Sequence, residues 1–189
     1  MAAKKIMMIR HAEKPSDDGA VHGVALNGND DPKELSVRGW QRAGALARFF
    51  APISDQLTDS RLAKPDVIFA SGIVSHRASL RPQNTVLPLS ELLGKSLDLR
   101  YSVGDEEALV ADALATDQTV LISWHHEAIP GIGNRILGNA TTCPQKWPGA
   151  RFDLVWIFEQ LPGSDQWSFD QVPQMLLAGD LPETISVSQ

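Results

Sequence analysis

Short apolar runs alternate along the chain with amphipathic stretches. Runs rich in branched or aromatic residues predict buried strands at residues 5–9, 67–70, 120–124 and 154–158. Between the first two runs, apolar residues recur at helical spacing behind Ser36, a favourable N-cap, and predict a helix over residues 37–50. The alternation of strand and helix predicts an α/β protein.

Three further helices are expected. One covers about residues 83–93, where Pro88 would cause a kink or a late start, and another opens at Asp105 and continues through Ala113. The third begins after His126, since Pro130 suits a first turn. Strand followed directly by helix is thus repeated, and polar residues at such junctions lie at the carboxyl edge of the sheet, where α/β proteins bind ligands.

Two segments resist a regular assignment. Residues 15–35, "PSDDGAVHGVALNGNDDPKEL", are rich in Gly, Asp and Asn and predict a long loop. Residues 138–153, "GNATTCPQKWPGARFD", contain two prolines and several turn-forming residues. Both segments fit either a functional rim or a surface excursion.

Length and composition favour one domain over residues 1–189, with 43% hydrophobic and 21% charged residues. The net charge of -6 disfavours nucleic acid and anionic membranes as partners. A single cysteine, Cys143, allows no internal disulfide, and no apolar run approaches a signal core or a membrane span. We therefore expect a cytoplasmic protein whose partner is a small molecule.

Several basic residues are placed to bind an anion. In "MMIRHAEKP", Arg10 and His11 end a predicted strand, where arginine can grip an anion and neutral histidine can act as a nucleophile, although a surface pair is an equal alternative. Arg81 in "ASLRPQNT" precedes a predicted helix and fits an anion site. His76 and Arg77 lie in the same stretch, and Arg77 reads as a surface residue.

Another set of polar residues, His125, His126 and Glu127, follows the predicted strand in "VLISWHHEAIP". Because neighbouring strand residues point to opposite faces, one of His125 and His126 is expected to reach the site while the other packs or caps. A zinc site made of these histidines and Glu127 is disfavoured, since the side chains diverge and the His-Glu-x-x-His spacing is missing. Two strands that end in histidine, with arginines beside them, would surround a phosphate with positive charge.

At this point the sequence resembles the histidine phosphatase superfamily, also called the phosphoglycerate mutase-like family. The resemblance lies in four blocks, in the family's order over about two thirds of the chain: "MIRHAEKP", "ELSVRGWQRAGALARFF", "SLRPQNTVLPLSELLG" and "VLISWHHEAIP". It implies a three-layer α/β/α sandwich with a mostly parallel central sheet.

The resemblance also implies roles for residues. His11 would be the nucleophile and form a phosphohistidine, while Arg10, Arg81 and a second histidine bind the phosphoryl oxygens, without a metal or other cofactor. The second histidine is His125 by analogy with Val-Gly-His-Gly members and His126 by analogy with Trp-x-His members. We favour His126, because Trp124 precedes the pair and Glu127 to Pro130 follow as in that subgroup.

Other roles remain open. Lys14 would add positive charge at the pocket mouth or be solvated. The proton donor to the leaving group is Glu13, Asp105, Glu106, Glu107 or none, and the acidic triplet fits a dipole-stabilised helix start better. Glu13 has the alternative role of orienting its loop.

The implied function is that of a metal-independent phosphatase that hydrolyses phosphate monoesters or a phosphorylated protein side chain. The alternative is a non-catalytic member of the same fold that binds a phosphorylated ligand or regulates another protein. The short chain disfavours a mutase, which needs more elaborate lids.

Overall fold

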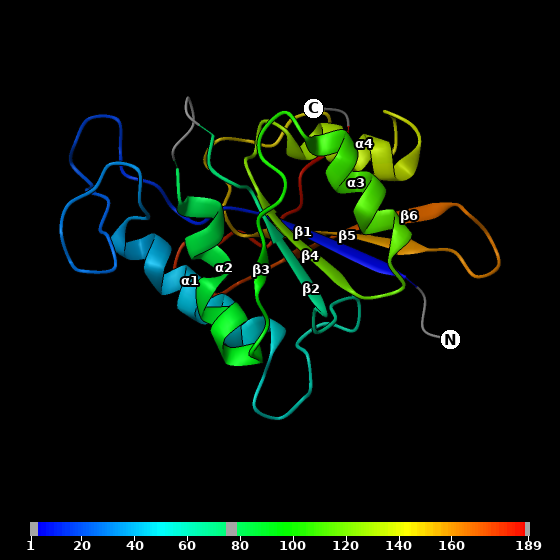
Figure 1. Ribbon diagram of the computed structural model, residues 1–189, viewed down its shortest axis with the longest axis horizontal. Coiled ribbons are helices and arrows are strands. Elements are labelled where there is room, and N and C mark those ends of the chain that lie inside the picture. The colour runs from blue at the N-terminus through cyan, green and yellow to red at the C-terminus, as the bar shows by residue number, and fades with distance from the viewer. Residues whose placement is uncertain (1–3, 75–78, 188–189) are drawn as a thin grey trace.

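The computed structural model describes residues 4–74 and 79–187, in which one six-stranded sheet is covered by helices (Figure 1). The strands are β1 (Lys5–Arg10), β2 (Val67–Ala70), β3 (Leu97–Asp98), β4 (Val120–Trp124), β5 (Leu154–Gln160) and β6 (Trp167–Pro173). The helices are α1 (Val37–Phe50), α2 (Arg81–Leu93), α3 (Glu106–Ala115) and α4 (Ile129–Leu137). The strand order is β3-β2-β4-β1-β5-β6.

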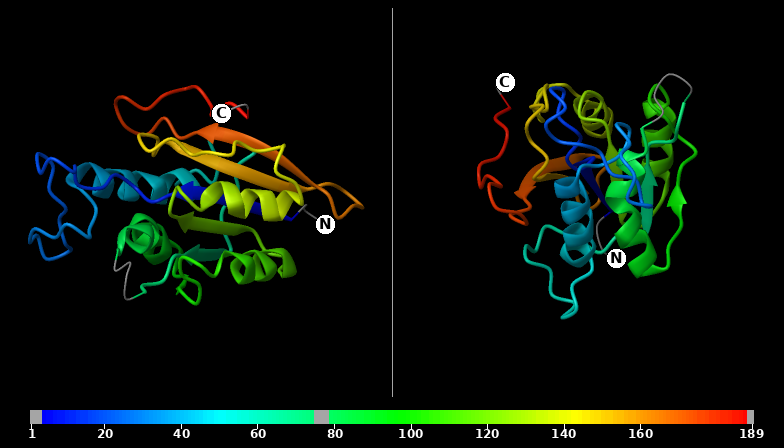
Figure 2. Two further views of the ribbon diagram at one scale, coloured as in Figure 1. Left: turned by 90° about the horizontal axis from the view of Figure 1, so that it is seen from above. Right: turned by 90° about the vertical axis from the view of Figure 1, so that its left-hand side faces the viewer.

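The sheet is mostly parallel. Strands β3, β2, β4 and β1 pair in parallel, whereas β5 pairs antiparallel with β1 and β6 pairs antiparallel with β5. Helices α1 and α2 cover one face and α3 and α4 cover the other (Figures 1 and 2). The predicted α/β/α sandwich with a mostly parallel sheet is therefore confirmed.

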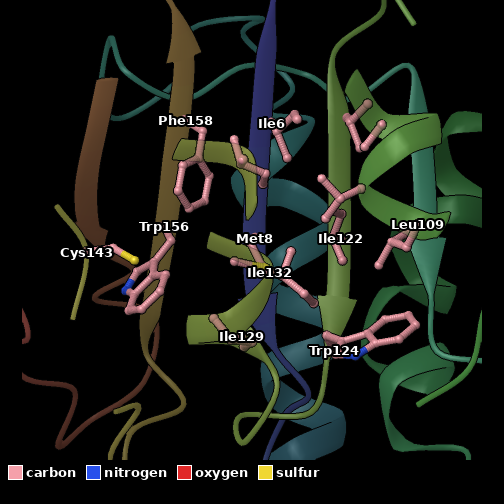
Figure 3. Packing of buried hydrophobic residues seen from close by; sticks show 14 of the residues in the cluster. Ile6, Met8, Leu109, Ile122, Trp124, Ile129, Ile132, Cys143, Trp156 and Phe158 are labelled. Carbon is pink, nitrogen blue, oxygen red and sulfur yellow. The ribbon is translucent and has the colours of Figure 1, made fainter. Parts of the chain in front are cut away.

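The central strand β1 supplies both cores. Ile6 and Met8 pack on the α3 and α4 side, where Trp124 and Phe158 also lie (Figure 3). Met7 and Ile9 pack on the α1 and α2 side. Alternation along a strand buried on both faces explains why residues 6–9 read as one apolar run.

Helix α2 differs from the expectation. It begins at Arg81 and continues through Pro88, so the expected late start is wrong. A proline inside a helix loses a hydrogen bond, at a cost of roughly 3 kcal/mol. Val86 and Leu89 on either side of it are fully buried in the core that α2 shares with α1, and this packing offsets the cost.

Two strands, β3 and β6, were not predicted from the sequence. Strand β6 completes one edge of the sheet, and its exposed and intermediate residues alternate at first. Strand β3 at the other edge has two residues, too few for a periodic signal. The start of α4, with Pro130 in the first turn, is as predicted, and α3 begins at Glu106, one residue after the expected position.

Residues 15–35 form a long loop that projects at one end of the molecule, near the start of α1 (Figure 2). Isolated bridges join Gly23 to Ser36 and Val24 to Asp30. Within residues 4–74 and 79–187, no helix combines the length and apolar character needed to cross a membrane. His76 and Arg77 lie outside the described residues.

Candidate active site

The predicted site begins where two neighbouring strands end. Strands β1 and β4 pair in parallel with Arg10 opposite Trp124, and the His11 N–H donates to the Trp124 carbonyl at 3.0 Å. The Arg10-His11 pair and the His125-His126 pair therefore leave the sheet side by side at its carboxyl edge. This is the edge at which α/β proteins bind ligands.

His11 is buried, with 3% of its surface exposed. Its Nδ1 lies 2.8 Å from the carbonyl oxygen of Ala12, and because a carbonyl can only accept, Nδ1 carries the proton. Burial holds the His11 pKa well below 6.5; the Ala12 hydrogen bond raises it, and Arg10 lowers it further. The ring is thus neutral, with an unprotonated Nε2, which is the form that nucleophilic attack requires.

Helix α2 holds the residue after His11. The Ala12 N–H donates to the Thr85 hydroxyl at 2.7 Å, and this hydroxyl donates to the Arg81 carbonyl at 2.7 Å. Thr85 is fully buried. The Arg-x-x-x-Thr spacing therefore has a local purpose, since it puts a threonine one helical turn after Arg81 and against the His11 loop.

Arg10 is 2% exposed and meets neutral groups. Its Nη1 donates to the carbonyls of Gly149, at 2.5 Å, and Arg151, at 3.2 Å, while its guanidinium carbon lies 3.8 Å from the centroid of the Phe152 ring. Its buried Nε has no hydrogen-bond partner among the described residues. Burial lowers the Arg10 pKa to about 10, although Glu127 opposes this, so the group remains charged at neutral pH.

Arg81 reaches the same site from the start of α2. Its Nε donates to the Glu34 carbonyl at 3.3 Å and its Nη2 to the Pro32 carbonyl at 3.1 Å, so the long loop supports it. Its positive charge is one of the causes that lower the pKa values of Arg10 and His11. Burial in turn lowers the Arg81 pKa. The structure therefore brings two cations to the nucleophile.

The two histidines after β4 lie beside different residues of the site. The His125 ring lies edge-on to the His11 ring, with 5.6 Å between centroids. His126 Nδ1 lies 3.1 Å from Glu127 Oε2, without hydrogen-bond geometry, and burial followed by the charges of Arg10 and Lys14 lowers the His126 pKa. Strand β4 ends at Trp124, so strand alternation does not extend to these residues.

The other candidate residues have protein partners. Lys14 Nζ donates to Asp17 at 2.7 Å. The Glu13 carboxylate accepts from Arg38 and Arg42, while Asp105 accepts from Ser102 and Glu106 from the Trp124 indole. Glu107 is exposed on α3. The structure therefore gives Glu13, Asp105 and Glu106 hydrogen-bond partners within the protein.

Some residues at the site were missed by the sequence analysis. Phe152 and the carbonyl of Gly149 come from the irregular segment 138–153, which has no periodic signal, and Arg42 had the ordinary appearance of a helix residue. Glu127 was considered as a zinc ligand, yet its charge acts on Arg10 and His126. Among residues 4–74 and 79–187, no three His, Cys, Asp or Glu side chains form a group that could hold a metal.

No family model and no curated protein sequence matches the chain. Solved structures do. A mycobacterial glucosyl-3-phosphoglycerate phosphatase superposes with a TM-score of 0.54 and 17% identity, covering 89% of this chain and 97% of that one. A putative alpha-ribazole-5'-P phosphatase from Escherichia coli superposes with a TM-score of 0.52 and 12% identity, covering 90% of this chain and 96% of that one.

A phosphoserine phosphatase mutant from Entamoeba histolytica, in complex with phosphoserine, gives a TM-score of 0.56 and 13% identity, covering 88% of this chain and 94% of that one. At such identities the likeness concerns the fold. The chain therefore has the phosphoglycerate mutase-like fold of these phosphatase structures, as the sequence motifs indicated.

Proposed function

We propose that this protein is a phosphatase that hydrolyses phosphate monoesters, or a phosphorylated protein side chain, through a phosphohistidine on His11. The observation that carries the proposal is the state of the His11 ring, which is buried, neutral and protonated on Nδ1 beside two arginines. A surface pair that merely closes a strand needs none of these features. Phosphatases among the structures of the same fold support the proposal.

In the first step, His11 Nε2 donates its lone pair to the phosphorus while the bond from phosphorus to the ester oxygen breaks. The leaving oxygen takes the electron pair of that bond, and a proton from solvent water where the leaving group is basic. Arg10 and Arg81 supply the positive charge that stabilises the equatorial phosphoryl oxygens, and a second histidine, His126, donates to one of them. We keep His126 in this role because the charge of Arg10 acts on it, whereas His125 packs against the nucleophile.

In the second step, water attacks the phosphorus, the bond to Nε2 breaks, and inorganic phosphate leaves. The ring nitrogen recovers its lone pair, and the proton of the water passes to solvent or to the phosphate. The Ala12 carbonyl keeps accepting from Nδ1, so the partial negative charge of this oxygen stabilises the positive charge that the ring acquires in the phosphohistidine. The chemistry uses no group beyond the protein, the substrate and water.

The second candidate is a non-catalytic protein that binds a phosphorylated ligand. It is favoured by the hydrogen bonds that occupy Glu13, Asp105 and Glu106, three of the carboxylates considered as proton donors, because a poor leaving group needs a nearby acid. An intact nucleophile opposes it. A substrate with a good leaving group, such as a phosphorylated side-chain nitrogen or an aryl phosphate, needs no acid and reconciles the site with catalysis.

The deciding experiment measures hydrolysis of p-nitrophenyl phosphate in the presence of a chelator and the acid-labile phosphate bound to the protein. We expect turnover and labelling in the wild type and neither in His11→Ala. The control is His22→Ala, which alters an exposed histidine that lies 3.8 Å from Asp30 and outside the site.

The outcomes separate the two candidates. Activity that survives His11→Ala would refute the role of His11. A wild type that binds phosphate tightly but neither turns over nor becomes labelled would favour the binding protein.

A further inference from the structure

A buried cluster of charges lies behind the nucleophile, formed by Glu13, Arg42 and Asp180. The Arg42 guanidinium donates to Glu13 through Nε and Nη2, the latter at 2.8 Å. It donates to both Asp180 oxygens, at 2.7 and 3.1 Å. The side chains of Arg42 and Asp180 are each 2% exposed, and that of Glu13 is 12% exposed. We call these three residues the charge cluster.

The charge cluster joins parts of the chain that are distant in sequence. Glu13 follows the nucleophile by two residues, Arg42 comes from α1, and Asp180 comes from the segment after β6. The Asp180 carboxylate also accepts from the backbone N–H groups of Leu176 and Leu177, at 2.8 and 3.0 Å. The position of Arg42 is therefore fixed by the C-terminal segment as well as by its own helix.

Glu13 is held at its backbone too. Its carbonyl accepts from the Ser36 N–H at 2.9 Å and from the Ser36 hydroxyl at 3.1 Å. The start of α1 lies so close that a Cβ on Gly39 would come within 2.4 Å of the Glu13 oxygen. The loop after His11 is thus fixed by both the backbone and the side chain of Glu13.

This matters for His11 because of the peptide unit between Ala12 and Glu13. The Ala12 carbonyl belongs to the same rigid plane as the Glu13 nitrogen, so a fixed Glu13 restricts the direction of that carbonyl. The carbonyl accepts the Nδ1 proton of His11 at 2.8 Å. On the other side, Thr85 holds the Ala12 N–H at 2.7 Å.

We propose that the charge cluster is a positioning device for the nucleophile. By fixing the Ala12–Glu13 peptide, Arg42 and Asp180 hold the Ala12 carbonyl against His11 Nδ1, which keeps the proton on that nitrogen and leaves Nε2 free to attack. Glu13, Arg42 and Asp180 are positioning residues, since they act through the Ala12 peptide. The catalytic part of this inference rests on the proposed function, whereas the statement about the ring proton does not.

The test compares the full-length wild type with Asp180→Asn, which removes one negative charge and keeps the side-chain shape. Nitrogen NMR of the His11 ring reports which nitrogen carries the proton, and kinetics with p-nitrophenyl phosphate report kcat and KM. We expect a detectable population of Nε2-protonated ring in Asp180→Asn. We expect kcat to fall by about 10–100-fold, the range seen when groups that orient metal-bound histidines are removed. KM should stay within about twofold, because the phosphate-binding arginines are untouched.

The matched control is Asp59→Asn, which breaks the ion pair with Arg61 at the other end of β1, where Asp59 and Arg61 lie 2.6 Å apart. It should change neither the ring proton nor kcat. Should Asp180→Asn fail to fold, Glu13→Gln tests the same path, since it leaves the pair of Arg42 and Asp180 intact. Restored kcat in Asp180→Glu would add support.

The results also separate this inference from the proposed function. An active wild type with an unchanged ring proton and kcat in folded Asp180→Asn or Glu13→Gln would overturn the positioning role. An inactive wild type would refute the proposed function, while the ring NMR would still decide whether the charge cluster sets the proton. A ring that becomes protonated on Nε2 in Asp180→Asn, but not in Asp59→Asn, supports the inference in either case.

Discussion

Two arginines of this protein are equally buried and have opposite surroundings. Arg10 and Arg42 are each 2% exposed. Burial lowers the pKa of both, but hydrogen bonds and charges from Asp180 and Glu13 outweigh it at Arg42 and raise the pKa, whereas at Arg10 it falls to about 10. A buried cation with its own carboxylates has its charge balanced within the fold, and a buried cation among carbonyls and an aromatic ring is suited to an anion from outside.

The largest effect is expected on stability at Arg42. Arg42→Met removes the buried cation of Glu13 and Asp180 and leaves them the half-exposed Arg38, at 3.2 and 3.8 Å, so the free energy of unfolding should fall by about 3 kcal/mol. Urea denaturation measures it. The control is Arg48→Met in the same helix, an exposed residue whose replacement should change stability by no more than about 0.5 kcal/mol. If Arg42→Met and Arg48→Met lowered the free energy of unfolding equally, Arg42 would not have the structural role that distinguishes it from Arg10.

A loss of activity rather than stability is expected at Arg10. Arg10→Met should lower kcat/KM by about 10²–10³-fold, the effect of removing one preorganised donor worth about 2.7–4 kcal/mol. The free energy of unfolding should fall by less than in Arg42→Met, by about 1–3 kcal/mol, because the Gly149 and Arg151 carbonyls lose a donor but no ion pair of Arg10 with a carboxylate of the described residues is broken. Steady-state kinetics and urea denaturation on one preparation measure both. A stability loss as large as that of Arg42→Met would make Arg10 structural.

Ligand binding should distinguish the two arginines by a smaller effect. Inorganic phosphate at 100 times its Kd should stabilise the wild type by about 2.7 kcal/mol, which thermal unfolding detects as a rise in Tm. The rise should disappear in Arg10→Met and persist in Asp180→Asn. A phosphate-dependent shift that persists in Arg10→Met would place the anion elsewhere.

The smallest effect concerns pH. The folded His11 pKa lies well below 6.5, so below pH 6.5 the unfolded chain gains a proton that the folded protein lacks. Stability conferred by the neutral ring is therefore present above pH 6.5 and decreases as the pH falls toward the folded pKa, by up to about 1.4 kcal/mol per unit. Between pH 6.5 and about 5, urea denaturation should show a smaller decrease in the free energy of unfolding for His11→Asn than for the wild type. If the free energy of unfolding depended on pH in the same way in both proteins, His11 would not be held neutral in the folded protein.

Much of the fold could be predicted from sequence, because β1, β4 and α1 have strong local signals. Buried strands appear as apolar runs, and Ser36 caps its helix through the Gly39 N–H as its type suggests. Strand β6 was missed although Trp167 to Asp170 alternate, and strand β3 is too short for any pattern.

The site was predicted where chemistry is local in sequence and missed where it depends on distant contacts. Arg10 and His11 end one strand, and Arg81 begins a helix, so residue type and position indicated them. The pairing of Arg42 with Asp180 spans 138 residues, and the packing of Phe152 on Arg10 depends on an irregular segment. Neither contact follows from spacing, since the folded chain alone brings these residues together.

The support of Arg81 by the long loop has a consequence for how such a protein can diversify. The carbonyls of Pro32 and Glu34 accept hydrogen bonds from the guanidinium, so the backbone of this loop sets the position of a cation at the proposed site. An insertion or deletion next to these two residues would shift Arg81 and, under the proposed function, weaken its contact with the phosphate. Side chains in residues 15–31 can therefore be replaced more freely than residues can be inserted or deleted, because replacement leaves the two carbonyls in place.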